Sequence, residues 1–184
     1  LNRHIRALSE RLVQGEPLTH NMLSWAKQHV EWSLAEGDYT ARDGVLMLVI
    51  DINGNAAMTV GEYEPLADTS AKALRARSAE ARSEADETGV APELLAAVNN
   101  GELAFVAPAD ECLCGTATLI EQLAQTKGIP VTRVDIPAQL KGALFLVSDE
   151  HGVVPAAETG AAEADAATVA FFADGYEKLR ARRS

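Results

Sequence analysis

The segment spanning residues 45–60 constrains the fold most, because its local chemistry dictates how two strands must meet. The segment from Val45 to Ile52, apolar through Ile50, is typical of a strand, and Asn53-Gly54 follows it directly. Asn-Gly is a preferred pair for a type I′ turn, in which both central residues adopt positive φ. Residues 55–60 then supply the return strand. The sequence therefore predicts a tight antiparallel hairpin.

Five other segments either carry apolar residues at the steps of an amphipathic helix or consist of strong helix formers. They are residues 1–13, 19–36, 71–88, 116–127 and 166–182. Thr19 is placed to cap the second of them and Gly37 to end it. Trp25 and Trp32 lie one heptad apart on that helix, and we expect both in the core. Residues 156–167 are rich in Ala, Glu and Thr, which predicts a mobile loop.

Residues 91–107 fit two structures. The alanines of Leu94 to Val98 favour a short helix, whereas Asn99-Asn100-Gly101 favours a turn between two strands, the second running from Leu103 to Ala107. Two more strands are expected at residues 129–134 and 143–147.

These elements predict an α/β fold of the mixed α+β kind. Helices and a β-hairpin form the N-terminal part, and a mixed sheet with helices forms the C-terminal part. We expect an N-terminal helical and hairpin subdomain over residues 1–66, a connecting helix over residues 67–90 and a C-terminal α/β subdomain over residues 91–184.

The chain is acidic, with a formal net charge of −11. Such a chain repels the phosphates of nucleic acids and anionic lipids, so neither is an expected partner. Arg75, Arg77 and Arg82 are interleaved with acidic residues, which predicts a solvated helix face. Cys112 and Cys114 are too close in sequence for an unstrained disulfide, and two thiols fit a reducing, cytoplasmic location.

Strong catalytic signatures are absent from the sequence, which contains no GxxxxGK[ST], GxGxxG, HExxH or GxSxG. One weaker candidate lies where the helix over residues 116–127 begins. Unpaired N–H groups at a helix start bind anions, so Gly115, Thr116 and Ala117 could cradle a phosphate. The alternative is a plain turn with small buried thiols.

Lys72 is the lysine of the helix expected over residues 71–88. In a dry pocket a lysine amine loses its proton and can form a Schiff base, whereas a solvated helix lysine is the ordinary alternative. His151 follows Asp149 and Glu150, a pattern that can supply metal ligands. Chance proximity is the favoured interpretation, because the histidines are scattered along the chain. The sequence thus predicts no metal site.

Four segments resemble those of one enzyme family, in the family's order. Leu1 to Leu8 resembles its arginine- and histidine-containing helix, and Thr69 to Ala73 the segment with its Schiff-base lysine. A third passage, from Leu103 to Leu119 and then from Leu123 to Val131, and a fourth, Phe145 to Ala156, resemble its later motifs. The last of them contains Gly-Val-x-Pro. The family is the fold-type IV pyridoxal-phosphate enzymes, which include branched-chain and D-amino-acid aminotransferases and aminodeoxychorismate lyase.

The resemblance implies an aminotransferase or lyase that acts on a small amino acid or keto acid with pyridoxal phosphate as cofactor. Lys72 would form the imine, and Gly115, Thr116 and Ala117 would hold the cofactor phosphate. Glu87 is the nearest substitute for the glutamate that holds the pyridine nitrogen. A homodimer is expected as well.

Departures from the family pattern leave two further alternatives open: a fold without the catalyst, or a chain from which segments of the family are omitted. The turn that carries the family's pyridine-binding glutamate is missing between Lys72 and Leu103. Asp149 stands where the family's second phosphate-binding threonine falls, and its charge would repel a phosphate. The strands that bring an arginine to the phosphate would lie before Leu1.

Residues 90–134 also resemble the ribosomal L7Ae and release-factor-related α/β/α sandwich domains, which implies a non-catalytic module that binds a protein or RNA partner. A third alternative is an assembly partner. A strand at Leu94 to Val98 favours the pyridoxal-enzyme fold, whereas a helix there favours the sandwich module. A second test is whether Lys72 points into a cavity near Gly115.

Overall fold

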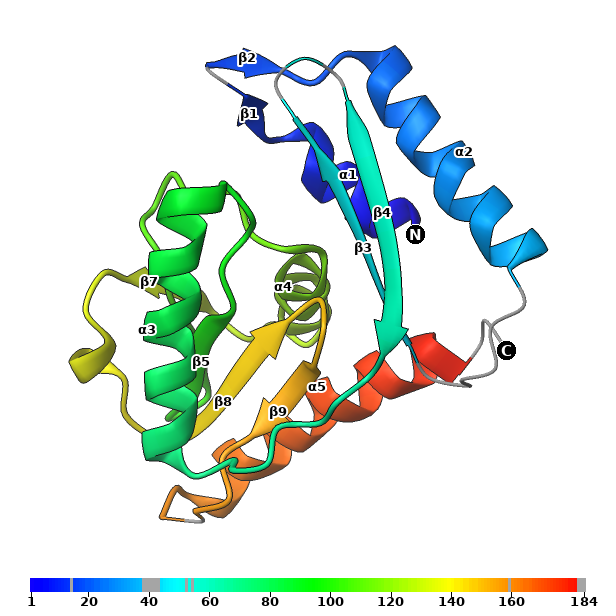
Figure 1. Ribbon diagram of the computed structural model, residues 1–184. Coiled ribbons are helices and arrows are strands. Elements are labelled where there is room, and N and C mark those ends of the chain that lie inside the picture. The colour runs from blue at the N-terminus through cyan, green and yellow to red at the C-terminus, as the bar shows by residue number, and fades with distance from the viewer. Residues whose placement is uncertain (14, 38–43, 52, 54, 159, 182–184) are drawn as a thin grey trace. The chain divides into compact units, whose positions relative to one another are not determined.

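The computed structural model describes residues 1–13, 15–37, 44–51, 53, 55–158 and 160–181 (Figure 1). The contacts divide the chain into two compact units, Leu1–Pro65 and Leu66–Ser184. Within the described ranges, no helix combines the length and apolarity needed to cross a lipid bilayer.

The first unit consists of short helices and small antiparallel sheets. Its elements are α1 (Asn2–Ser9), β1 (Leu12–Val13), β2 (Glu16–Pro17), α2 (His20–Glu36), β3 (Gly44–Ile50) and β4 (Ala56–Glu62). Strands β3 and β4 pair along their whole length, from Gly44 opposite Glu62 to Ile50 opposite Ala56. The antiparallel pair predicted for residues 45–60 is therefore confirmed.

The turn between β3 and β4 is closed by a side chain. The Asp51 carboxylate accepts hydrogen bonds of 2.8 Å from the backbone N–H groups of Asn53 and Asn55 and from the Asn55 side-chain amide. The hydrogen bond from the Asn55 side chain is the largest of the causes that lower the pKa of Asp51. Gly54, the second residue of the predicted turn, lies outside the described residues.

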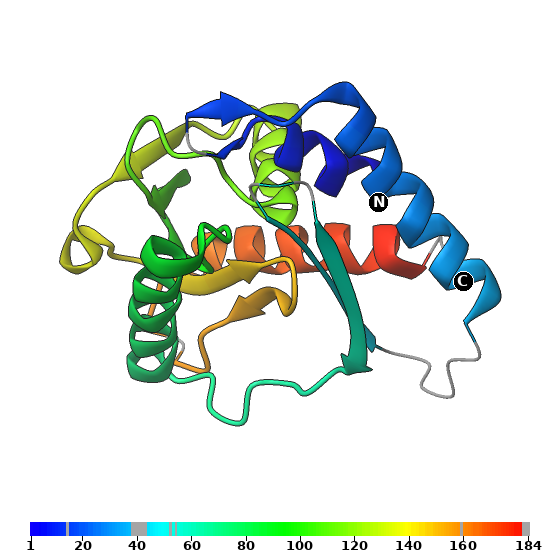
Figure 2. The ribbon, with the colours of Figure 1, turned by 45° about the horizontal axis from the view of Figure 1, so that its top comes forward.

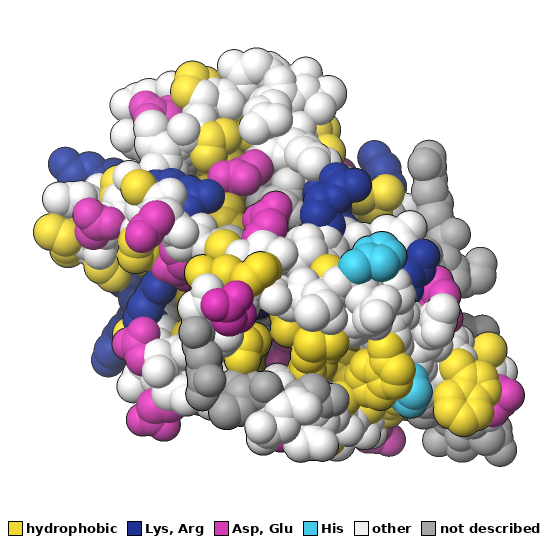
Figure 3. All heavy atoms as spheres, turned by 90° about the horizontal axis from the view of Figure 1, so that it is seen from above, with side chains coloured by type: hydrophobic (Ala, Val, Ile, Leu, Met, Phe, Trp, Pro, Cys, Tyr) yellow, Lys and Arg dark blue, Asp and Glu magenta, His cyan; other side chains and the backbone are white. Residues whose placement is uncertain are grey.

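Helix α2 begins as predicted but buries other residues than expected. The Thr19 hydroxyl accepts a hydrogen bond of 3.2 Å from the backbone N–H of Met22. The small residues Ala26 and Val30 occupy the buried stripe of the helix. Trp25 and Trp32 are 37% and 57% exposed, so the expectation that both lie in the core was wrong. Hydrophobic side chains and histidines lie next to one another on the surface shown in Figure 3.

The second unit contains a five-stranded mixed sheet with helices on both faces. Its elements are α3 (Ala71–Thr88), β5 (Leu94–Asn99), β6 (Glu102–Val106), α4 (Gly115–Thr126), β7 (Val131–Val134), the 3-10 turn η1 (Pro137–Gln139), β8 (Ala143–Ser148), β9 (Gly152–Pro155) and α5 (Glu163–Ala181). The strand order is β7-β6-β5-β8-β9, in which β6 and β7 are parallel and the other neighbours antiparallel.

Alternate side chains of the central strands build two separate cores. The even-numbered residues of β5 pack with Ile120 of α4 and Phe172 of α5. Its odd-numbered residues pack with Leu74 of α3. Because successive side chains of a strand point to opposite faces, α3 covers one face of the sheet, and α4 and α5 cover the other (Figures 1 and 2).

Of the two structures that the sequence allowed for residues 91–107, a helix or a hairpin, the chain forms the hairpin. Leu94 to Val98 form a strand that is buried throughout, which is the position of a central strand between two cores. Asn100 and Gly101 both have positive φ, as a two-residue type I′ turn requires. The helix that the sandwich-module alternative needs at residues 94–98 is therefore not formed.

The first turn of α5 holds this hairpin in place. The Asp165 carboxylate, which is 4% exposed, accepts hydrogen bonds of 3.0 Å from the backbone N–H groups of Asn100 and Gly101. Helix α5 begins at Glu163, so the mobile loop expected over residues 156–167 was wrong for its second half. Acidic residues such as Glu163 and Asp165 suit a helix N-terminus because its N–H groups carry partial positive charge.

Replacing Leu74 with Ala should lower the free energy of unfolding by about 2–5 kcal/mol, because it leaves a cavity between α3 and the sheet. Leu74 is 0% exposed, whereas Leu179 of α5 is 43% exposed. Leu179→Ala is therefore the matched control, with an expected loss of under about 0.5 kcal/mol. Urea denaturation followed by circular dichroism measures both, and equal losses would contradict the packing of α3.

Candidate functional site

The residues predicted to bind pyridoxal phosphate lie at three places in the second unit. Lys72 is exposed in the first turn of α3. Glu87 is exposed in the last turn of the same helix. Gly115, Thr116 and Ala117 are buried in the first turn of α4.

The sheet separates Lys72 from the predicted phosphate cradle. Helix α3, which carries Lys72, packs on the odd-numbered side chains of β5, whereas α4 packs on the even-numbered ones. The two helices therefore lie on opposite faces of the sheet, as Figure 1 shows. Lys72 is exposed on the α3 side of the sheet, and Gly115 is buried on the α4 side.

Glu87 is also distant from Lys72. The two residues are fifteen positions apart on one helix, which at 1.5 Å per residue places their Cα atoms about 22 Å apart. A pyridoxal ring is far smaller than this separation. The described structure thus does not bring Lys72, Glu87 and the first turn of α4 together around one cofactor.

A carboxylate of the chain itself occupies the start of α4. Asp149 accepts hydrogen bonds from the backbone N–H groups of Gly115 (3.1 Å) and Thr116 (2.7 Å) and from the Thr116 hydroxyl (2.8 Å). The next N–H group, that of Ala117, donates to the Cys114 sulfur at 3.4 Å. The N–H groups that a phosphate would need at this helix start already have partners.

The turn between β8 and β9 positions Asp149. The Ser148 hydroxyl accepts a hydrogen bond of 2.8 Å from the backbone N–H of His151, which tightens the turn. Gly152 follows with a φ of +72°, and a Cβ atom there would lie 2.3 Å from the Tyr176 ring of α5. A larger residue at Gly152 would therefore require the Tyr176 ring or the turn to shift.

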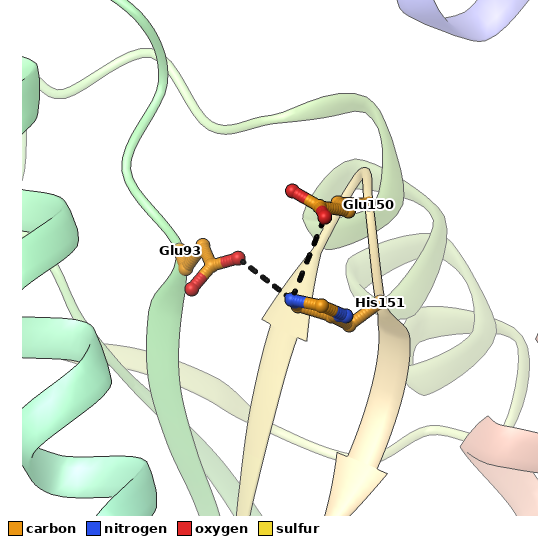
Figure 4. Close-up of side chains that lie close together, drawn as sticks. All are labelled: Glu93, Glu150 and His151. Carbon is orange, nitrogen blue, oxygen red and sulfur yellow. Dashed lines mark ion pairs between the residues drawn. The ribbon is translucent and has the colours of Figure 1, made fainter. Parts of the chain in front are cut away.

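Glu150 and His151 of the same turn form a cluster with Glu93, which directly precedes β5 (Figure 4). The His151 Nε2 atom lies 3.6 Å from Glu93 Oε1 and 3.9 Å from Glu150 Oε1. On the other side of Glu93, Arg77 Nε donates a hydrogen bond of 2.6 Å to Oε2. This hydrogen bond is the largest cause that raises the pKa of Arg77.

Sequence reasoning missed the residues that connect α3 to the sheet. Arg77 and Arg82 were expected on a solvated face, but they pair with Glu93 and Glu111 respectively. Arg75 also bonds to the sheet side of the unit, through the backbone carbonyl of Pro137 at 2.7 Å. The prediction that Arg75, Arg77 and Arg82 form a solvated helix face was therefore wrong. Sequence spacing carries no signal for such pairs, because the partners lie 16 to 62 positions away.

Replacing Asp149 with Ala should lower the free energy of unfolding by about 1 kcal/mol, the usual cost of losing a side-chain acceptor at a helix start. Asp149→Asn keeps an oxygen acceptor and should lose less. Asp174→Ala, at an exposed position of α5, is the control for removal of a surface carboxylate. Thermal and urea unfolding measure the series, and equal stability of Asp149→Ala and Asp174→Ala would contradict the role of Asp149.

Comparison with known proteins identifies the fold. No protein-family model and no curated protein matches this chain. A solved candidate branched-chain amino acid aminotransferase from Thermotoga maritima matches with a TM-score of 0.58 at 15% identity, over 95% of this chain and 78% of that one.

Two further solved structures are less similar. An aminotransferase from Brucella abortus bound to pyridoxal phosphate has a TM-score of 0.47 at 14% identity, over 96% of this chain and 81% of that one. A candidate 4-amino-4-deoxychorismate lyase has a TM-score of 0.44 at 17% identity, over 88% and 98%. The Thermotoga match carries the conclusion: the chain has the fold of the fold-type IV pyridoxal-phosphate enzymes, as the sequence resemblance predicted.

Proposed function

We propose that this chain is an aminotransferase- or lyase-like protein that keeps the fold-type IV architecture and has lost pyridoxal-phosphate catalysis. The observation that carries the proposal is the Asp149 carboxylate on the N–H groups of Gly115 and Thr116. A carboxylate there satisfies the donors and repels a phosphate dianion. The start of α4 is thus filled from within the chain.

The described residues do not fit the cofactor as a set. Pyridoxal-phosphate chemistry needs a lysine amine, an anion cradle and a partner for the ring nitrogen around one molecule. Here Lys72 lies on one face of the sheet, the start of α4 lies on the other, and Glu87 is about 22 Å from Lys72 along α3. We therefore derive no catalytic step through the cofactor.

The proposal also includes the class of small molecule that the chain binds. The Thermotoga protein with this fold is named as a candidate branched-chain amino acid aminotransferase. A small amino acid or keto acid is accordingly the molecule that we assign to this chain, as a bound ligand rather than a substrate. A homodimer and a reducing, cytoplasmic location, in keeping with the thiols of Cys112 and Cys114, complete the proposal.

An imine-trapping experiment tests the loss of the cofactor site. The purified chain is mixed with stoichiometric pyridoxal phosphate, its visible absorbance is recorded, and borohydride reduction is followed by peptide mass mapping. We expect Lys72 to be labelled no more than Lys141, because both lysine side chains are exposed to solvent.

Lys72→Ala and Lys141→Ala serve as matched variants. Equal, weak absorbance of the wild-type chain and both variants would support a protein without a dedicated cofactor lysine. A strong imine band that disappears in Lys72→Ala alone, with reduced cofactor recovered on the Lys72 peptide, would overturn the proposal and restore Lys72 as the catalytic lysine.

A further inference from the structure

We infer that Glu93, Glu150 and His151 form a binding site for a divalent first-row transition-metal ion. Glu93 directly precedes β5, and the other two residues come from the turn between β8 and β9 (Figure 4). One ligand atom of each side chain lies within 4.8 Å of the other two. The three residues are brought together by the antiparallel pairing of β5 with β8.

The separations suit ligands that surround an ion. His151 Nε2 is 3.6 Å from Glu93 Oε1 and 3.9 Å from Glu150 Oε1. Both distances exceed the 2.7–3.2 Å of an N–H···O hydrogen bond. Two ligands about 2.1 Å from a tetrahedral ion lie about 3.4 Å apart, so small rotations of the side chains would complete the coordination.

Arg77 and Ser78 of α3 hold Glu93 in the required orientation. Arg77 Nε binds Oε2 at 2.6 Å, which leaves Oε1 on the side of His151. The Ser78 hydroxyl donates to the Glu93 carbonyl at 3.0 Å and accepts from the Leu95 N–H at 3.2 Å, which fixes the start of β5. Hydrogen bonds of this kind, which orient a ligand from outside the coordination sphere, strengthen metal sites.

Burial and charge favour a cation with open coordination positions. The His151 and Glu93 side chains are 5% and 10% exposed, whereas Glu150 is 43% exposed. Solvent can therefore reach the site from the side of Glu150 and supply water ligands. The two carboxylates outweigh the Arg77 guanidinium by one negative charge, and the chain as a whole carries −11.

The donor set decides the class of metal. An imidazole nitrogen with two carboxylate oxygens suits zinc, cobalt, manganese or iron, whereas calcium and magnesium prefer oxygen ligands alone. The inference does not rest on the proposed function, because a chain that formed an imine at Lys72 could still bind a metal at this turn.

Isothermal titration calorimetry of the chelator-treated full chain with zinc chloride tests the inference. We expect one ion per chain, and a loss of affinity of at least about tenfold in Glu150→Gln and in His151→Gln. Magnesium chloride should bind far more weakly. Cobalt chloride, titrated in parallel, should give a visible absorption spectrum that His151→Gln changes.

Control variants separate this site from other zinc ligands. His20→Gln removes an exposed histidine of the first unit, and Cys112→Ser removes a thiol; neither should change the affinity. Circular dichroism confirms folding, and Glu150→Gln, whose side chain is the most exposed of the three, decides the matter if His151→Gln unfolds. Unchanged affinity in Glu150→Gln, or loss confined to Cys112→Ser or His20→Gln, would overturn the inference.

Discussion

The burial of β5 on both of its faces is the constraint on which the rest of the second unit depends. Leu94 to Val98 contribute alternate side chains to two cores, so each face of the sheet must be covered by a helix. Helix α3 covers one face, and α4 and α5 cover the other. Lys72 and the first turn of α4 lie on opposite faces of the sheet for this reason, because they belong to helices that cover different faces.

The turn between β8 and β9 concentrates the charges of the unit at one end of the sheet. Asp149 turns to the partial positive charge at the start of α4, and its carboxylate is satisfied there by three donors. His151 instead lies between Glu150 and Glu93, the residue directly before β5. Adjacent residues of one turn therefore lie in two different electrostatic environments, one that attracts an anion and one that attracts a cation.

Local chemistry made most of the elements predictable from the sequence. Thr19 caps α2, and the turns at Asp51 and at Asn100-Gly101 close two hairpins, because each depends on residues a few positions apart. Interactions between distant segments were not predictable. The spacing of Trp25 and Trp32 indicated a shared helix face, but only the packing of the first unit decides which face is buried.

The candidate sites show the same division between local and distant information. The helix start at Gly115 was visible in the sequence, and so was the charge conflict of Asp149 with a phosphate. The direct contact between them spans 33 and 34 positions and required the fold. Glu93 had no motif around it, and it completes the cluster with His151 only because β5 and β8 are neighbours. Gly115 and Thr116, which the sequence assigned to a phosphate, thus contact Asp149 of the turn between β8 and β9. Glu150 and His151 of the same turn lie in the cluster with Glu93. The start of α4 is thus filled by a carboxylate of the chain itself.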